Sequence, residues 1–154
     1  MRRRLWPKMA NSYRTSRNRA LDLARVLLVD DDVTSRLTLQ TVLEAGGYQV
    51  DAAASAAEAV GKLDEREYEL VLSDLRMDSP EAGLKVLAHA RMMDYKPATA
   101  LVTTYQDSRD RDHKDSAMVL IEPEDLPDLL SRVADLVSER ATRKVERQLR
   151  HAGN

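Results

Sequence analysis

Three adjacent carboxylates stand at the end of an apolar segment, in the stretch VLLVDDDVT from Val26 to Thr34. A second junction of this kind occurs at Asp74, after the apolar residues of ELVLSD. Carboxylates that crowd together repel one another unless a cation offsets their charge. Mg²⁺ suits such a site, because it takes hard oxygen ligands and is commonly held by one or two carboxylates with water and phosphate oxygens. If the two junctions meet in the fold, the acidic cluster is therefore suited to phosphate chemistry.

The elements that position these acids are predicted by apolar runs that alternate with helical spacings. Most of the runs lack the alternating polarity of a half-exposed strand, so we expect buried strands at residues 25–30, 48–54, 69–74, 98–104 and 117–123. Helices are expected over residues 34–45, 56–63 and 84–93 and from residue 125 onward, and the polar segment 106–116 predicts a short or poorly anchored helix. The pattern implies an α/β fold with a doubly wound, five-stranded parallel sheet, because parallel strands need crossover connections. Ligands of such sheets collect at the carboxyl ends of the strands, so we expect the two acidic junctions to be neighbours.

Composition limits the classes to which the protein can belong. A chain of 154 residues is long enough for one domain that buries roughly two-thirds of its unfolded surface. The chain has no Cys, which excludes disulfides and thiolate chemistry, and its three His residues are too far apart for a His-rich metal site. No stretch approaches a membrane span, and no apolar region follows the basic N-terminus, so we expect a cytoplasmic protein.

The net charge of -2 hides a strong segregation of charge along the chain. Residues 1 to 25 carry eight Arg or Lys against one acid, residues 26 to 137 carry eleven against twenty-three, and residues 138 to 154 carry five against two. Basic ends of this kind contact nucleic acid or other anionic surfaces in some proteins and are solvated leaders in others. We favour a solvated leader, because the first 25 residues offer only Trp6 and Tyr13 for stacking and contain no recognisable binding motif.

From Val26 to about Ser138 the chain resembles a receiver domain of two-component response regulators. VLLVDDD is similar to the first-strand motif of that family, LVLSDLRM to the phosphoacceptor strand, LVTTY to the fourth-strand hydroxyl motif and IEPEDL to the proline turn after strand five. The resemblance implies a flavodoxin-like (βα)5 fold in which Asp74 accepts a phosphoryl group. The donor would be a histidine kinase, a phosphotransfer protein or a small phosphodonor.

The same resemblance implies roles for the neighbouring residues. Asp30 and Asp31 would hold Mg²⁺ together with Asp74 and the backbone carbonyl of Arg76. Thr103 would hydrogen-bond a phosphoryl oxygen in the modified state and act as the switch. Asp32 is expected to cap the following helix instead, by accepting hydrogen bonds from N–H groups near Thr34 and Ser35.

Two departures from the family pattern affect signalling. Receiver domains place a Lys just before the proline after strand five, and this chain has Glu122 before Pro123. A negative charge beside a phosphoryl site removes electrostatic stabilisation and adds repulsion. The loop after Asp74 also carries an apparent extra residue, which displaces Pro80 and Gly83 relative to the family's Met-Pro…Gly loop.

Two other classes of function remain open. VDDDVT also fits the hhhDxDxT pattern of haloacid-dehalogenase-like phosphatases, in which Asp30 would be the nucleophile and Asp32 the general acid and base, with Thr34 in support. A downstream motif with the further Lys and acids of that family is not evident. The third class is a receiver-like interaction module that works without phosphorylation, and Glu122 is the residue that favours it.

We expect three segments: a basic leader at residues 1–25, a receiver domain at residues 26–138 and a basic helical extension or tail at residues 139–154. Such a chain would be a stand-alone signalling protein, not an enzyme, whose output is the binding of a downstream protein. Val145 and Leu149 continue the apolar pattern of the last helix, which fits either a solvated tail or a self-association seam that forms a homodimer.

Overall fold

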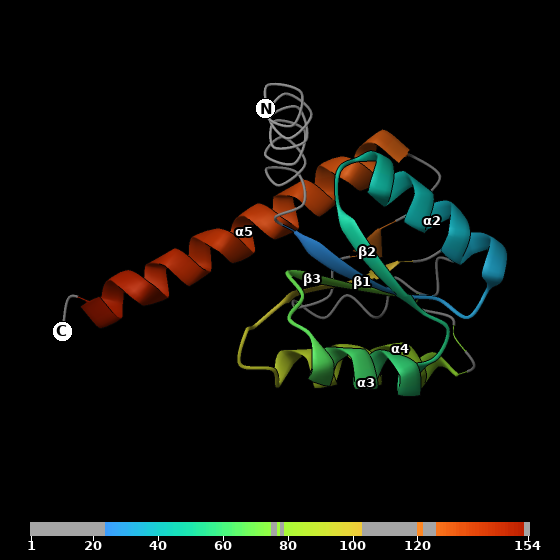
Figure 1. Cartoon of the computed structure of the whole chain (residues 1–154), viewed down its shortest axis with the longest axis horizontal. Coiled ribbons are helices and arrows are strands. Elements are labelled where there is room, and N and C mark those ends of the chain that lie inside the picture. Colours follow the sequence, from blue (N-terminus) through green and yellow to red (C-terminus); the bar gives the residue numbers. More distant parts are fainter. Residues whose placement is uncertain (1–23, 75–76, 78, 103–119, 122–125, 153–154) are drawn as a thin grey trace, which may run out of the picture.

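The computed structural model describes residues 24–74, 77, 79–102, 120–121 and 126–152 (Figure 1). Its elements in chain order are β1 (Arg25–Val29), α2 (Val33–Ala45), β2 (Gln49–Ala53), α3 (Ala56–Glu65), β3 (Leu70–Asp74), α4 (Pro80–Arg91), β4 (Ala98–Val102), β5 (Leu120–Ile121) and α5 (Leu126–Ala152). The strands form one parallel sheet in the order β2-β1-β3-β4-β5. The predicted doubly wound α/β fold is therefore confirmed, and the polar segment 106–116 lies outside the described residues.

Both faces of the sheet are covered, because successive side chains of a strand point to opposite sides. On one face, Leu27 and Val29 of β1 pack with buried residues of α3 and α4. On the other face, Val26 and Leu28 pack with buried residues of α2 and α5. Figure 1 shows these two helical layers on either side of the strands. The absence of polar alternation in β1 and β3 thus reflects burial on both faces, as the sequence predicts.

Local signals set the ends of the first two helices. Asp32 is the N-cap of α2, and its carboxylate accepts a hydrogen bond from the N–H of Ser35 at 2.8 Å, which confirms the predicted cap. Ser55 caps α3 in the same way. At the other end of α2, the N–H of Gly47 donates to the carbonyl of Glu44, and Gly47 has a φ of 101°, a conformation that favours glycine.

The start of α4 differs from the expectation. The helix begins at Pro80, four residues before the predicted residue 84. Ser79 caps it by accepting a hydrogen bond from the N–H of Ala82 at 3.2 Å, and Pro80 occupies the first turn, where its missing N–H costs nothing. The residues Pro-Glu-Ala-Gly of that turn carry no large apolar side chain, so the spacing of apolar residues does not reveal the turn. Pro80 and Gly83 therefore belong to a helix and not to the loop.

The last helix continues well past the sheet. It is unbroken from Leu126 to Ala152, with Pro127 in its first turn as expected, and Figure 1 shows its C-terminal half running beyond the strands. Arg140 is buried where the helix passes the sheet, and it donates to the carbonyls of Tyr95 at 2.7 Å and Lys96 at 3.1 Å. These two bonds fix α5 to the turn before β4. Within the described part of the chain, no helix is both long and apolar enough to cross a membrane.

Tyr95 supports the same turn from inside. Its hydroxyl donates to the carbonyl of Leu63 at 3.0 Å. Burial raises the pKa of Tyr95 to about 12, and the carboxylates of Asp64 and Glu67 add to the rise, whereas the charge of Arg140 opposes it. The hydroxyl therefore stays protonated and keeps its hydrogen bond at any physiological pH.

The first turn of α4 packs directly on the end of β3. A Cβ atom at Gly83 would lie 2.6 Å from the backbone oxygen of Asp74 and 3.3 Å from Oγ of Ser73, so only glycine fits without movement. At Gly61, within α3, an added Cβ would meet nothing within 4 Å. The two glycines thus form a natural comparison.

We expect Gly83→Ala to destabilise the fold by about 1–3 kcal/mol, because the new methyl group must displace the backbone of Asp74. Gly61→Ala should stabilise it by about 0.5–1 kcal/mol, because alanine loses less entropy than glycine in an open helical position. Urea unfolding of both variants beside the parent protein measures the two changes. Equal effects of the two substitutions would contradict the close approach of α4 to Asp74.

Candidate functional site

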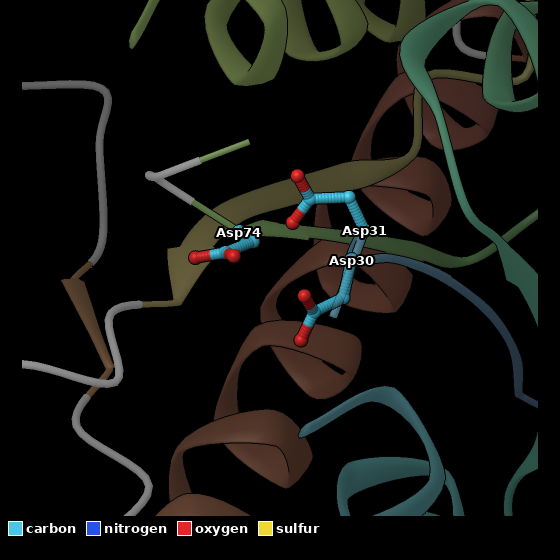
Figure 2. Close-up of side chains that lie close together, drawn as sticks. All are labelled: Asp30, Asp31 and Asp74. Atoms are coloured by element: carbon cyan, nitrogen blue, oxygen red, sulfur yellow. The ribbon is translucent and has the colours of Figure 1, made fainter. Parts of the chain in front are cut away.

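The site lies where two neighbouring strands end. β1 and β3 run in parallel with Val29 opposite Ser73, so the next residues along the two strands, Asp30 and Asp74, come side by side. Asp30, Asp31 and Asp74 each offer a carboxylate oxygen, and these oxygens lie within 4.8 Å of one another. Figure 2 shows the three side chains gathered at the ends of the two strands. The sequence predicted this juxtaposition, because both acidic junctions follow the carboxyl ends of strands in a parallel sheet.

The position is a topological switch point of the sheet. From β1 the chain crosses to β2 on one side, whereas β4 and β5 lie on the other side of β3. The crossover helices therefore leave β1 and β3 in opposite directions, which opens a crevice at the carboxyl ends of these two strands. Ligands of doubly wound sheets bind in such crevices.

Asp30 is held in place by its backbone and by one carboxylate oxygen. Its side chain is 1% exposed, and its N–H donates to the carbonyl of Ala53 at 3.0 Å. Its Oδ1 accepts a hydrogen bond from the N–H of Asp32 at 3.0 Å. Its Oδ2 is also buried, and it accepts no hydrogen bond from any residue that the structure describes. A buried carboxylate oxygen without a donor is costly, so this atom is suited to an outside ligand.

The residue types and their geometry fit a magnesium ion. Mg²⁺ takes oxygen ligands and needs only one or two protein carboxylates. The cluster offers three carboxylates, and Asp74 is 8% exposed while Asp31 is half-buried, so the site is sheltered but reachable. A divalent cation would also offset the repulsion among the three acids. Asp30, Asp31 and Asp74 are therefore suited to hold the ion, with Oδ2 of Asp30 as the oxygen most in need of it.

Asp32 serves the helix and not this cluster. Its carboxylate caps α2, and it does not belong to the group of oxygens that meet within 4.8 Å. In the phosphatase alternative this carboxylate would be the general acid and base. Here it is engaged as the N-cap of α2 and lies outside the acidic cluster.

The four remaining predicted site residues lie outside the described residues: Arg76, Thr103, Glu122 and Pro123. Their roles stay predictions.

Sequence reasoning missed two residues that shape the site. Arg36, in the first turn of α2, donates from its guanidinium to the backbone carbonyl of Asp30 at 2.8 Å. Its only sequence signal is its place one helical turn after Asp32. Gly83 allows α4 to approach the carbonyl of Asp74, and its signal is a glycine inside a helix, where glycine is unfavourable.

An apolar surface lies beside the acids. Val33 and Leu37, one turn apart on α2, are 57% and 56% exposed although both are large apolar residues. They follow directly on the acidic triplet, so α2 presents an apolar patch next to the site. Exposed apolar groups that cluster beside a functional site are typical of a protein interface.

Comparison with known proteins agrees with this geometry. Residues 26–121 match the family model described as the response regulator receiver domain. The transcriptional regulatory protein CpxR homolog of Haemophilus influenzae is 35% identical over 85 residues, which cover 55% of this chain and 37% of that protein. The transcriptional regulatory protein ZraR of Salmonella typhimurium is 42% identical over 80 residues, which cover 52% of this chain and 18% of that protein. The chain thus spans well under half the length of these two relatives.

Solved structures show the same fold. The response regulator TrrA of Thermotoga maritima, in complex with Mg²⁺-BeF, superposes with a TM-score of 0.64 at 28% identity, and the match covers 73% of this chain and 98% of that one. A CheY-like receiver domain protein of Methanospirillum hungatei superposes with a TM-score of 0.64 at 25% identity, with 78% and 98% covered. Receiver domains are signalling modules that interact with histidine kinases and downstream effectors. With its strand order, its acidic triad and the match over residues 26–121, the chain belongs to the response regulator receiver family.

Proposed function

We propose that this protein is a phosphoacceptor receiver of a two-component phosphorelay, which takes a phosphoryl group on Asp74 and signals by binding a partner. The observation that carries the proposal is the meeting of Asp30, Asp31 and Asp74 within 4.8 Å, with a buried oxygen of Asp30 that has no donor among the described residues. Receiver domains typically bind Mg²⁺ at an acidic pocket of this kind, and TrrA, at 28% identity, was solved in complex with Mg²⁺-BeF.

In this proposal Asp74 is the nucleophile. A carboxylate oxygen of Asp74 attacks the phosphorus of the donor, an O–P bond forms, and the bond from phosphorus to the donor atom breaks with its electron pair leaving on the donor. When the donor is a phosphohistidine, the leaving ring nitrogen keeps that pair and takes up a proton. The product is an acyl phosphate on Asp74. The close packing of Gly83 against the carbonyl of Asp74 holds the nucleophile in place.

The other acids prepare the site for this transfer. Asp30 and Asp31, with the backbone carbonyl of Arg76, would hold Mg²⁺ beside Asp74. The ion supplies charge that offsets the transferring phosphoryl group and orients it for in-line attack. Thr103 would bind a phosphoryl oxygen afterwards. Glu122 stands where the family has Lys. We therefore expect phosphorylation of Asp74 to drive the switch less effectively than in receivers that have this Lys.

We expect incubation with acetyl phosphate and Mg²⁺ to add one phosphoryl group to the parent protein and none to Asp74→Asn, as intact-protein mass spectrometry can measure. Chelation of Mg²⁺ with EDTA should prevent the addition, because the three carboxylates then repel the incoming phosphoryl group. Peptide mapping locates the adduct. An adduct on Asp30 would support the phosphatase alternative, and no adduct, where a known receiver is modified, would support an interaction module that works without phosphorylation.

Magnesium should also stabilise the fold through the same residues. At a free Mg²⁺ concentration about 100 times the Kd, the parent protein should gain about 2.7 kcal/mol of unfolding free energy. Asp30→Asn should lose most of this gain, and in EDTA it should unfold at a higher temperature than the parent because one repelling charge is gone. Asp32→Asn is the matched control, because asparagine also caps helices and Asp32 lies outside the triad. Mg²⁺ should stabilise this variant as much as it stabilises the parent protein. Thermal unfolding with and without Mg²⁺ tests both variants.

The apolar patch of Val33 and Leu37 is the surface that we assign to the phosphoryl donor protein, because it adjoins the nucleophile's site. With a histidine kinase that modifies the parent protein, Leu37→Arg should lower the transfer rate by about 10-fold or more, because a charge replaces an apolar contact. The rate at which acetyl phosphate labels Leu37→Arg should equal that of the parent protein. Leu149→Arg is the control, because Leu149 is also an exposed leucine, at 65%, and lies on the far part of α5. A loss of both reactions in Leu37→Arg would mean that the substitution damages the site itself.

A further inference from the structure

Arg36 is a half-buried cation in the first turn of α2, directly after the acidic triplet. It shares a face of the helix with the buried residues Leu39 and Leu43, which follow it by three and seven positions. Side chains of a helix tilt toward its N-terminus, so the guanidinium of Arg36 reaches back toward β1. There it donates to the backbone carbonyl of Asp30 at 2.8 Å. The end of β1 thus receives a cation from the helix that follows it.

Three hydrogen bonds close a ring through Asp30, Asp32 and Arg36. The N–H of Asp32 donates to Oδ1 of Asp30 at 3.0 Å, and the N–H of Arg36 donates to the carbonyl of Asp32 at 2.9 Å. The guanidinium of Arg36 then returns to the carbonyl of Asp30. The ring fixes the backbone and one carboxylate oxygen of Asp30. It leaves the buried Oδ2, to which no described residue donates, for a ligand.

The charge of Arg36 is not used in a contact ion pair. Its guanidinium bonds to a neutral carbonyl, and among the described residues no carboxylate oxygen lies within 4.0 Å of it. The carbonyl and the carboxylate of Asp30 belong to one residue, so standard bond lengths keep the cation within roughly 8 Å of that carboxylate. Salt screens charges only partly over such a distance. The cation therefore acts on the acidic triad without contacting a carboxylate.

Two simpler explanations account for only part of this arrangement. The carbonyl of Asp30 needs a donor because the residue is 1% exposed, but a neutral side chain such as that of glutamine would supply one. The helix dipole does not favour the charge either, because the N-terminus of a helix is its positive end and disfavours cations. The first turn of α2 carries no acid that would offset this cost. The negative charge of the triad is what makes a cation favourable there.

We propose that Arg36 is a positioning residue and the built-in counter-charge of the acidic triad. Without a metal ion, its charge offsets the repulsion among the three carboxylates and so stabilises the fold. The same charge repels a divalent cation at the triad and attracts an anionic phosphoryl donor, so it lowers the affinity for Mg²⁺ and raises the affinity for the donor. The statement about the donor rests on the proposed phosphoryl transfer. The statement about stability does not.

Thermal unfolding of the full chain in EDTA tests the counter-charge without a metal ion. Arg36→Gln keeps an N–H donor but removes the charge, so it should unfold about 2–4 °C below the parent protein. Arg36→Lys keeps the charge and should unfold close to the parent. In an Asp30→Asn background Arg36→Gln should have a smaller effect, because one of the charges that it offsets is gone. An equal loss in both backgrounds would mean that Arg36 only supports the carbonyl, and would overturn the proposal.

Calorimetric titration with Mg²⁺ and the kinetics of labelling by acetyl phosphate separate the charge from a structural role. Arg36→Gln should bind Mg²⁺ about 5-fold more tightly than the parent protein, whereas its KM for acetyl phosphate at saturating Mg²⁺ should rise by about 5-fold. Arg36→Lys should match the parent in both measurements.

Arg147→Gln is the matched control, because it removes the same charge from an exposed position near the far end of α5. It should bind Mg²⁺ and react with acetyl phosphate as the parent does. Unchanged or weaker binding of Mg²⁺ by Arg36→Gln would contradict the counter-charge, since damage to the triad lowers the affinity and a charge too far away leaves it as it is. If the parent forms no phosphoryl adduct, the proposed phosphoryl transfer fails, and the unfolding measurement in EDTA still decides the role of Arg36.

Discussion

Electrostatic repulsion among the carboxylates of Asp30, Asp31 and Asp74 is the constraint that the rest of the structure must meet. Two unit charges about 4 Å apart repel by about 1 kcal/mol in water and by about 4 kcal/mol at the effective dielectric of a protein surface. A domain has only about 5–15 kcal/mol of net stability. Three acids that approach within 4.8 Å therefore need a frame that holds them together in the absence of a cation.

The central strands supply that frame. β1 and β3 lie between other strands and are buried on both faces, so the positions at which they end are fixed by hydrogen bonds and by packing. Asp30 is tied to β2 through the carbonyl of Ala53, and Asp74 is backed by Gly83. Among the residues that the structure describes, none donates a hydrogen bond to the buried Oδ2 of Asp30, so this oxygen is the one that the frame leaves without a partner there. A site built in this way is preorganised for a cation and does not have to assemble around one.

Sequence reasoning found those features that depend on the strands and on the helix caps. Buried strands that end in acids predicted the order of elements and the meeting of Asp30 with Asp74, and Asp32 was correctly expected to cap α2. It missed the first turn of α4, because that turn has no large apolar residue. It also missed Arg36 and Arg140, since each donates to a backbone carbonyl. Such bonds depend on where a distant or neighbouring carbonyl points, which no pattern of residue types records.

The acidic triad lies at the carboxyl ends of the strands, and the cations of α5, such as Lys144, lie near their amino ends. The length of the strands separates the two groups. Strands of five residues, such as β1, span about 17 Å at 3.3–3.4 Å per residue. At this distance two unit charges interact by only about 0.2 kcal/mol in water, so the cations near Lys144 offset little of the charge of the acidic triad. Neutralisation of the triad must therefore be local, from a metal ion or a nearby side chain.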